Sequence, residues 1–170
     1  MEKSLLDSYF YALNRVIDVI YHEEDLSDTL YFIVSLAKEL TGAKGSTIRV
    51  LEHGSFNLKV VASCGLSQAY LRSGAIDRGK SITEIMKGDT IFIDDFTTSD
   101  SVEDCEAAKK EGVNAVIGIP FTVNETTYSI LRVYFTNKKV PLKEEMELLN
   151  SLGRLSCLAI NMAAGRDVMP

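Results

Sequence analysis

Hydrophobic residues recur with the period of a helix near both ends of the chain. Residues 4–21 carry large apolar residues at alternating steps of four and three, and a second amphipathic pattern follows over residues 26–40. A third begins near Pro141, a residue type that is favourable in the first turn of a helix. The first pattern is a heptad-like seam, formed by Leu6, Phe10, Leu13, Ile17 and Ile20.

The middle of the chain changes to the two-residue period of β-strands. Two hairpins and one further strand are expected there, with short helices between them. Antiparallel strands followed and preceded by helices predict the α+β class, with the terminal helices packed together on one face of the sheet. The predicted strands are 46–52, 58–63, 90–94, 114–123 and 127–135, and the short helices lie within 81–89 and 100–112.

Alternation along the strands assigns side chains to the two faces of the sheet. In the last strand, Leu131 and Val133 belong to an apolar face that suits the terminal helices, whereas Arg132 and Tyr134 point to the opposite face. Arg49 is expected on that opposite face as well. In the strand 58–63, the same alternation places Leu58, Val60 and Ala62 opposite Lys59, Val61 and Ser63.

The mixed face is the candidate ligand site. Burying a charge without a partner is costly, so Arg132 needs water, an acid such as Asp94 or Asp95, or an anionic ligand. The irregular stretch 64–112 is left to cover this face as a lid. Apolar walls with a few polar groups beneath a lid are typical of a small-molecule pocket.

Composition narrows the class of protein. The 170 residues are 46% hydrophobic and 25% charged, and the net charge of −6 argues against non-specific binding of nucleic acid. No apolar stretch approaches the ~20 residues of a membrane helix, and the acidic start does not read as a secretory signal. Cys64, Cys105 and Cys157 form neither a zinc pattern nor a disulfide framework, so we expect a cytoplasmic protein.

The order of the elements resembles a GAF domain, the small-molecule sensor module of many signalling proteins. "LKVVASCGL" resembles the second strand of the family and the glycine after it, and "VPLKEEMELLNSLGRLSCLAIN" resembles its closing helix. "IDRGKSITEIMKGDTIFIDDF" and "AAKKEGVNAVIGIPFTVNETTYSILRVYF" resemble the segments between them. The resemblance covers roughly residues 24–164, and implies a pocket on the mixed face with Asp94 and Asp95 at its rim.

Several positions depart from the patterns of particular GAF subfamilies. Ser129 stands where many members have glycine, and Asn137–Lys138 with Glu144–Glu145 supply only part of the cyclic-nucleotide signature. Cys105 is followed by an acid, whereas bilin-binding members have a histidine there. The cofactor therefore stays undetermined, and no metal site is expected. The candidate ligand-binding residues are Arg49, Ser63, Cys64, Asp94, Asp95, Thr122, Arg132 and Tyr134.

The resemblance also implies a domain organisation and a function. Residues 1–22 form an N-terminal helix for dimerisation or linkage, 23–165 the sensor domain, and 166–170 a tail. We expect a non-catalytic regulatory domain that binds a small polar or anionic ligand, forms a homodimer through its terminal helices, and passes the signal to a C-terminal output domain. The alternatives are a dimerisation scaffold with a degenerate pocket, and a free methionine sulfoxide reductase that uses Cys64 and Cys105. Neither nucleic acid nor a membrane is an expected partner.

Overall fold

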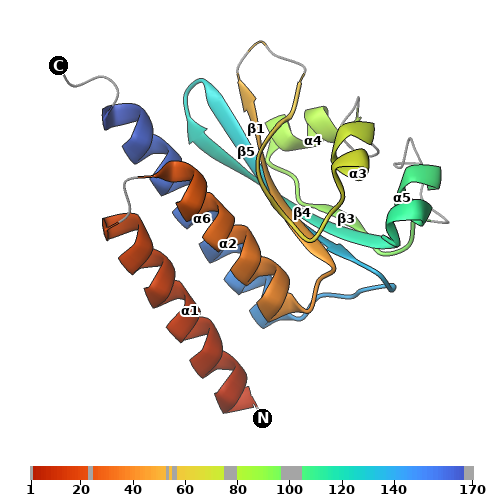
Figure 1. Cartoon of the computed structure of the whole chain (residues 1–170), viewed down its shortest axis with the longest axis horizontal. Helices are drawn as coiled ribbons and strands as arrows, with labels where there is room; N and C mark the ends of the chain where they lie inside the picture. Colours follow the sequence, from red (N-terminus) through yellow and green to blue (C-terminus); the bar gives the residue numbers. More distant parts are fainter. Residues whose placement is uncertain are drawn as a thin grey trace.

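The computed structural model describes residues 2–22, 25–52, 54, 57–74, 80–96 and 105–166. It is an α+β fold in which helices lie on both faces of one sheet (Figure 1). The helices are α1 (Glu2–His22), α2 (Leu26–Thr41), α3 (Gln68–Ser73), α4 (Lys80–Lys87), α5 (Cys105–Glu111) and α6 (Lys143–Arg166). The strands are β1 (Gly45–Glu52), β2 (Lys59–Cys64), β3 (Ile91–Ile93), β4 (Ala115–Asn124) and β5 (Thr127–Phe135).

The sheet has five strands in the order β2-β1-β5-β4-β3, and neighbouring strands are antiparallel. The long helices α1, α2 and α6 lie on one side of it, and α3, α4 and α5 lie on the other (Figure 1). We refer to α3, α4 and α5 together as the lid. The predicted fold class, with an antiparallel sheet and terminal helices on one face, is confirmed.

The long helices and the facing side of the sheet enclose the helix-side core. From α1 this core receives an inner stripe, in which Tyr9, Val16 and Ile20 recur at helical spacing. The larger part of the predicted seam points elsewhere, because Leu6, Phe10 and Ile17 are more than half exposed. The buried sheet residues of this core are Ile48, Ala62, Ala115, Ile117, Ile119, Leu131, Val133 and Phe135.

The lid and the other side of the sheet enclose a second, lid-side core. Tyr70 of α3, Ile85 of α4 and Ala108 of α5 each contribute a buried side chain to it. Each of the three lid helices is therefore attached to the sheet by apolar packing. The sheet residues of this core are Leu51, Ile91, Ile93, Val116, Ile130 and Tyr134, and Leu58 joins them from the position just before β2.

A β-bulge interrupts the alternation of β2. Ile48 of β1 pairs with Ala62, but the next residue, Arg49, pairs with Val60, so Val61 is an extra residue in β2. Val60 therefore shares a face with Arg49 and not with Ala62. The predicted grouping of Leu58, Val60 and Ala62 is wrong, because an inserted residue reverses the two-residue period at that point.

The helix-side face is not purely apolar. Ser46 and Ser129 share the parity of Ile48 and Leu131, and both serines are almost completely buried. Among the described residues, neither hydroxyl has a hydrogen-bond partner.

Candidate functional site

Two arginines lie side by side on the lid-facing side of the sheet. Thr47 pairs with Arg132 and Arg49 pairs with Ile130, so the two arginines are diagonal neighbours on adjacent strands. Their Cβ atoms are therefore separated by roughly 7 Å. Arg49 is 4% exposed and Arg132 is 0% exposed. The sheet thus holds two buried arginines on neighbouring strands, both on the side that faces the lid.

Gly118 of β4 provides the space for Arg132, its partner in the neighbouring strand. A Cβ at Gly118 would lie 3.3 Å from Cγ of Arg132 and 3.1 Å from Cδ1 of Ile130. Both distances are shorter than ordinary van der Waals contact. The glycine therefore allows the long arginine side chain to cross the strand.

Polar and aromatic contacts attach α3 to this part of the sheet. Arg49 Nη2 donates a hydrogen bond of 3.5 Å to the carbonyl oxygen of Leu71. The rings of Tyr70 and Tyr134 meet edge to face with centroids 5.9 Å apart. The hydroxyl groups of Tyr134 and Thr47 are 3.3 Å apart, within hydrogen-bond distance. Helix α3 is thus attached to Arg49 and Tyr134 of the sheet.

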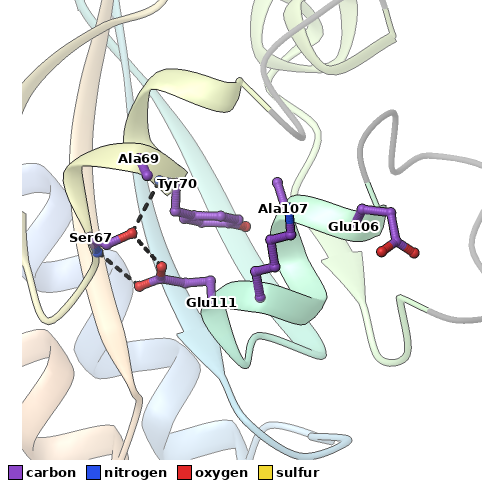
Figure 2. Close-up of a pocket in the computed structure, with 7 residues that line it drawn as sticks. Ser67, Ala69, Tyr70, Glu106, Ala107 and Glu111 are labelled. Carbon is purple, nitrogen blue, oxygen red and sulfur yellow. Dashed lines mark hydrogen bonds between the residues drawn. The ribbon is translucent and has the colours of Figure 1, made fainter.

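A cavity of about 580 Å³ lies between α3 and α5, and Figure 2 shows the side chains around it. This volume is within the range of small-molecule sites. Tyr70 separates the cavity from the sheet, since its ring packs against Tyr134. The described residues that line it are Ser67, Ala69, Tyr70, Glu106, Ala107, Lys110 and Glu111.

One carboxylate connects the two helices beside this cavity (Figure 2). Glu111, the last residue of α5, accepts hydrogen bonds from the Ser67 amide at 2.8 Å and from the Ser67 hydroxyl at 2.5 Å. The same hydroxyl accepts a hydrogen bond from the Tyr70 amide at 3.1 Å and so caps α3. Glu111 therefore fixes the beginning of α3 against the end of α5.

Four of the eight candidate residues lie together on the lid-facing side of β2, β1 and β5. Arg49, Arg132 and Tyr134 are buried there. Ser63 is half-buried and pairs with Thr47 across β1 and β2.

The other four candidate residues lie apart from this group. Cys64 is partly buried against the helix-side core. Asp94 forms an exposed ion pair with Lys138 at 3.1 Å, and the half-buried Asp95 follows it. Thr122 is exposed in β4 opposite Tyr128. None of the eight candidates is among the described residues that line the cavity between α3 and α5.

Sequence reasoning did not identify Ser67, Tyr70 or Glu111. Ser67 has a local signal, because a serine that precedes a short helix is a favourable N-cap. Glu111 has none, since its partner lies 44 residues away in the chain. Tyr70 reads as an ordinary apolar residue of a short helix, and only the fold brings its ring to Tyr134.

The described cysteines and acids do not form a reactive or metal-binding centre. Cys157 is buried in α6, and burial raises its pKa to about 11, only partly opposed by a hydrogen bond with Ser156. The side chain of Cys105 lies outside the described residues. Within the described part of the chain, no group of three or more histidine, cysteine or acidic residues could hold a metal ion. No helix there is long and apolar enough to cross a membrane.

Comparisons with known proteins agree with this architecture. The sequence model of the GAF domain matches residues 25–160, which begin after α1. No curated protein matches the sequence.

Solved structures of the same fold cover nearly the whole chain. The phycocyanobilin-bound GAF domain of a cyanobacterial phytochrome is 15% identical over 95% of this chain and 98% of its own, with a TM-score of 0.75. The GAF domain of a phosphoenolpyruvate-protein phosphotransferase from Coxiella burnetii is 14% identical over 95% and 97%, with a TM-score of 0.74. Free methionine-R-sulfoxide reductase from Neisseria meningitidis, solved with its substrate, is 15% identical over 93% and 91%, with a TM-score of 0.73.

Proposed function

Because the chain belongs to the GAF domain family, we propose that it is a non-catalytic regulatory domain that binds a small polar or anionic molecule between its sheet and its lid. The solved relatives include a domain that holds a bilin and a domain from a phosphotransferase. Ligand binding under the lid would be passed to the terminal helices. We propose the cytoplasm as the location of this activity.

The single observation that supports the ligand site is the burial of Arg49 and Arg132 on one face of the sheet. Each guanidinium group carries a positive charge and several N–H donors. A carboxylate or phosphate group is complementary to guanidinium in both charge and hydrogen-bond geometry. Tyr134 and Thr47 add hydroxyl groups to the same surface. Ser63 adjoins this group through its pairing with Thr47, and Asp94, Asp95 and Thr122 are candidate contacts at the periphery, whereas Cys64 packs toward the opposite face.

Strand β5 provides a physical connection between this surface and the helices. Arg132 faces the lid, while its neighbours Leu131 and Val133 pack in the helix-side core. A displacement of β5 that improves contacts with a ligand must therefore move residues that support α6. We propose that this movement is the signal, since a ligand shifts a conformational equilibrium only by binding the two states differently.

The exposed side of α1 is the proposed homodimer interface. Leu6, Phe10 and Ile17 form an outer stripe on α1, and Phe10 is 72% exposed. Large apolar residues that recur along an exposed helix favour a helical partner. A second copy of α1 presents the same stripe and would cover it symmetrically. An output domain joined beyond α6 would then receive the signal through the dimer.

A thermal-shift screen of the full chain tests the ligand proposal. The panel consists of nucleotides, amino acids and organic acids. We expect at least one anionic member to raise the melting temperature, because a molecule that binds only the folded state stabilises it. Arg132→Lys should weaken this shift, since lysine keeps the charge but loses the bidentate geometry. Arg154→Lys, an exposed position in α6, is the matched control and should leave the shift unchanged.

If no member of the panel binds and Arg132→Lys only lowers stability, the domain is a dimerisation scaffold with a degenerate pocket. If the shift is the same in both variants, the ligand binds elsewhere. The first result would contradict the proposed ligand binding, whereas the second would contradict only the proposed location of the ligand.

The reductase alternative follows from the structural likeness to the Neisseria meningitidis enzyme. It requires an accessible thiolate, whereas Cys64 packs beside the helix-side core and the pKa of Cys157 is raised by burial. The test is reduction of free methionine-R-sulfoxide by the full chain with dithiothreitol. Turnover that is lost in Cys64→Ser or Cys105→Ser would replace the regulatory proposal, and the regulatory proposal predicts none.

A further inference from the structure

We propose that the outer edge of β2 is a docking site for an acidic, extended segment of a partner protein, which would add a strand to the sheet. This proposal does not depend on the ligand site beneath the lid. It follows from the position of β2, the groove beside it, and the charges around that groove.

Strand β2 is the end of the sheet. Among the described strands it pairs only with β1, and the strand order begins with β2. In an antiparallel pair, every second residue of an edge strand directs its N–H and C=O groups away from its neighbour. These groups are a template for a further strand, as in proteins that bind peptides by β-augmentation.

A groove of about 440 Å³ runs beside this edge. Four consecutive residues of β2, 60–63, form one wall, and at ~3.3 Å per residue they span about 13 Å. Gln68, Leu71 and Arg72 of α3 form the other wall. Their spacing places them on one face of the helix. The groove therefore offers an extended peptide two kinds of contact. The edge of β2 can form backbone hydrogen bonds with it, and the apolar and polar side chains of α3 can contact its side chains.

The walls of the groove are held in place by contacts on both sides of α3. Arg49 Nη2 binds the carbonyl oxygen of Leu71, and Glu111 binds the amide and hydroxyl of Ser67. The first contact fixes α3 to the sheet and the second fixes it to α5. A preformed groove costs less ordering of the protein when a segment binds.

The charges around the groove favour an acidic segment. Arg72 is exposed at the groove, and Lys59 is exposed at the beginning of the same strand. The side chain of Lys38 lies close to Gly65, just beyond the other end of β2. The described residues that line the groove include no acid. This is a basic region on a chain with a net charge of −6, so it attracts a partner of opposite charge selectively.

The same features disfavour a second copy of this chain as the occupant. Pairing of two β2 edges would bring the lysines and arginines of both copies together. Lysines on edge strands are a common means of preventing self-association. The edge is therefore protected against itself and remains accessible to an acidic peptide.

The test uses the full chain and two short peptides of alternating residues, valine with glutamate and valine with lysine. Binding is followed by the amide NMR signals of residues 60–63 and by fluorescence anisotropy. We expect the glutamate peptide to shift these signals and to bind roughly tenfold more tightly than the lysine peptide. Arg72→Glu should remove or reverse this preference. Lys87→Glu, an exposed lysine of α4, is the control for a change in net charge and should retain it.

A second measurement tests strand addition without altering the protein. Methylating alternate backbone nitrogens along one edge of the glutamate peptide should abolish binding, whereas methylating the other edge should not, because only one edge meets β2. Equal effects of the two patterns would overturn the proposal. Absence of any shift at residues 60–63, or a change of oligomeric state in Arg72→Glu without peptide binding, would overturn it as well.

Discussion

The ring of Tyr70 meets the ring of Tyr134 edge to face, with centroids 5.9 Å apart and planes at 88°. Tyr70 belongs to the lid and Tyr134 to the sheet, so this pair joins the two layers that enclose the proposed ligand site. Tyr70 also borders the cavity between α3 and α5. This aromatic contact therefore contributes to both the position of α3 and the shape of the cavity.

Replacing Tyr70 with alanine should detach α3 from the sheet. We expect a loss of about 3 kcal/mol in the free energy of unfolding, because the change removes a buried aromatic ring and its pairing with Tyr134. Tyr31→Ala is the control, since Tyr31 is 56% exposed in α2 and should change stability by less than about 0.5 kcal/mol. Urea unfolding measures both. Equal losses would show that Tyr70 is not a principal attachment of the lid.

Glu111→Gln should loosen the connection between α3 and α5. The amide keeps the size of the side chain but weakens the two hydrogen bonds from Ser67, so we expect a local loss of about 1 kcal/mol. Hydrogen exchange of the α3 amides should accelerate. Glu106→Gln is the matched control, because Glu106 forms an exposed ion pair with Lys109 of its own helix, so this change should leave α3 unchanged. Unchanged exchange in Glu111→Gln would contradict the assignment.

Two glycines of α6 should respond to alanine in opposite directions. A Cβ at Gly153 would overlap the ring of Phe121, so Gly153→Ala should destabilise the fold by about 1–3 kcal/mol. A Cβ at Gly165 meets nothing within 4 Å, and alanine favours the helix there, so Gly165→Ala should be neutral or stabilising by up to about 1 kcal/mol. Thermal unfolding distinguishes them. Phe121→Leu should partly restore the stability of Gly153→Ala, and failure to do so would place the strain elsewhere.

Alkaline pH should destabilise the protein through Cys157. Burial raises the pKa of its thiol from 9.0 to about 11 in the folded state. The unfolded chain therefore releases its proton first, so the contribution of this group is fully present below pH 9 and is lost between pH 9 and about 11. Burial, with Glu145 and Glu144, also raises the pKa of Tyr9, which acts in the same direction above pH 10.0.

Unfolding in urea under reducing conditions, at pH 8, 10 and 11, measures this dependence. Cys157→Ala should show a smaller decrease of stability between the lowest and highest pH than the unaltered chain. The comparison uses the change of the free energy of unfolding with pH, so a loss of stability that is the same at every pH does not affect it. Parallel pH profiles of the two proteins would exclude Cys157 as the group responsible.

Phe10→Glu should dissociate the proposed homodimer. The substitution places a charge in the outer stripe of α1 and leaves the inner stripe of Tyr9 and Val16 intact, so the fold should persist. Sedimentation velocity measures the oligomeric state, and circular dichroism checks the helix content. Phe92→Glu, at an exposed position of β3, is the control and should remain dimeric. A monomeric unaltered chain would contradict the proposed interface.

The sequence by itself determined the elements and the side to which most of their residues point. The helical periods near both ends, the two-residue period of the middle, and the position of Arg132 opposite Leu131 all depend on neighbours in the chain. Gly42 ends the second helix with φ of 65°, a backbone conformation that glycine adopts without strain. The order of short motifs identified the GAF resemblance over nearly the same residues as the family match.

Only the tertiary structure decided which surfaces meet. The bulge at Val61 depends on how β2 pairs with β1. It exchanges the two faces of the sheet for the β2 residues before it, whereas the two-residue alternation assigns faces correctly in β5. The bond between Glu111 and Ser67 joins residues 44 positions apart, and no local pattern records it. The first helix carries two apolar stripes, and packing against α2 and α6 buries Tyr9 and Val16 while Phe10 stays exposed. Local periodicity shows that a side chain is apolar, but the competition among long-range contacts determines which apolar side chains are buried.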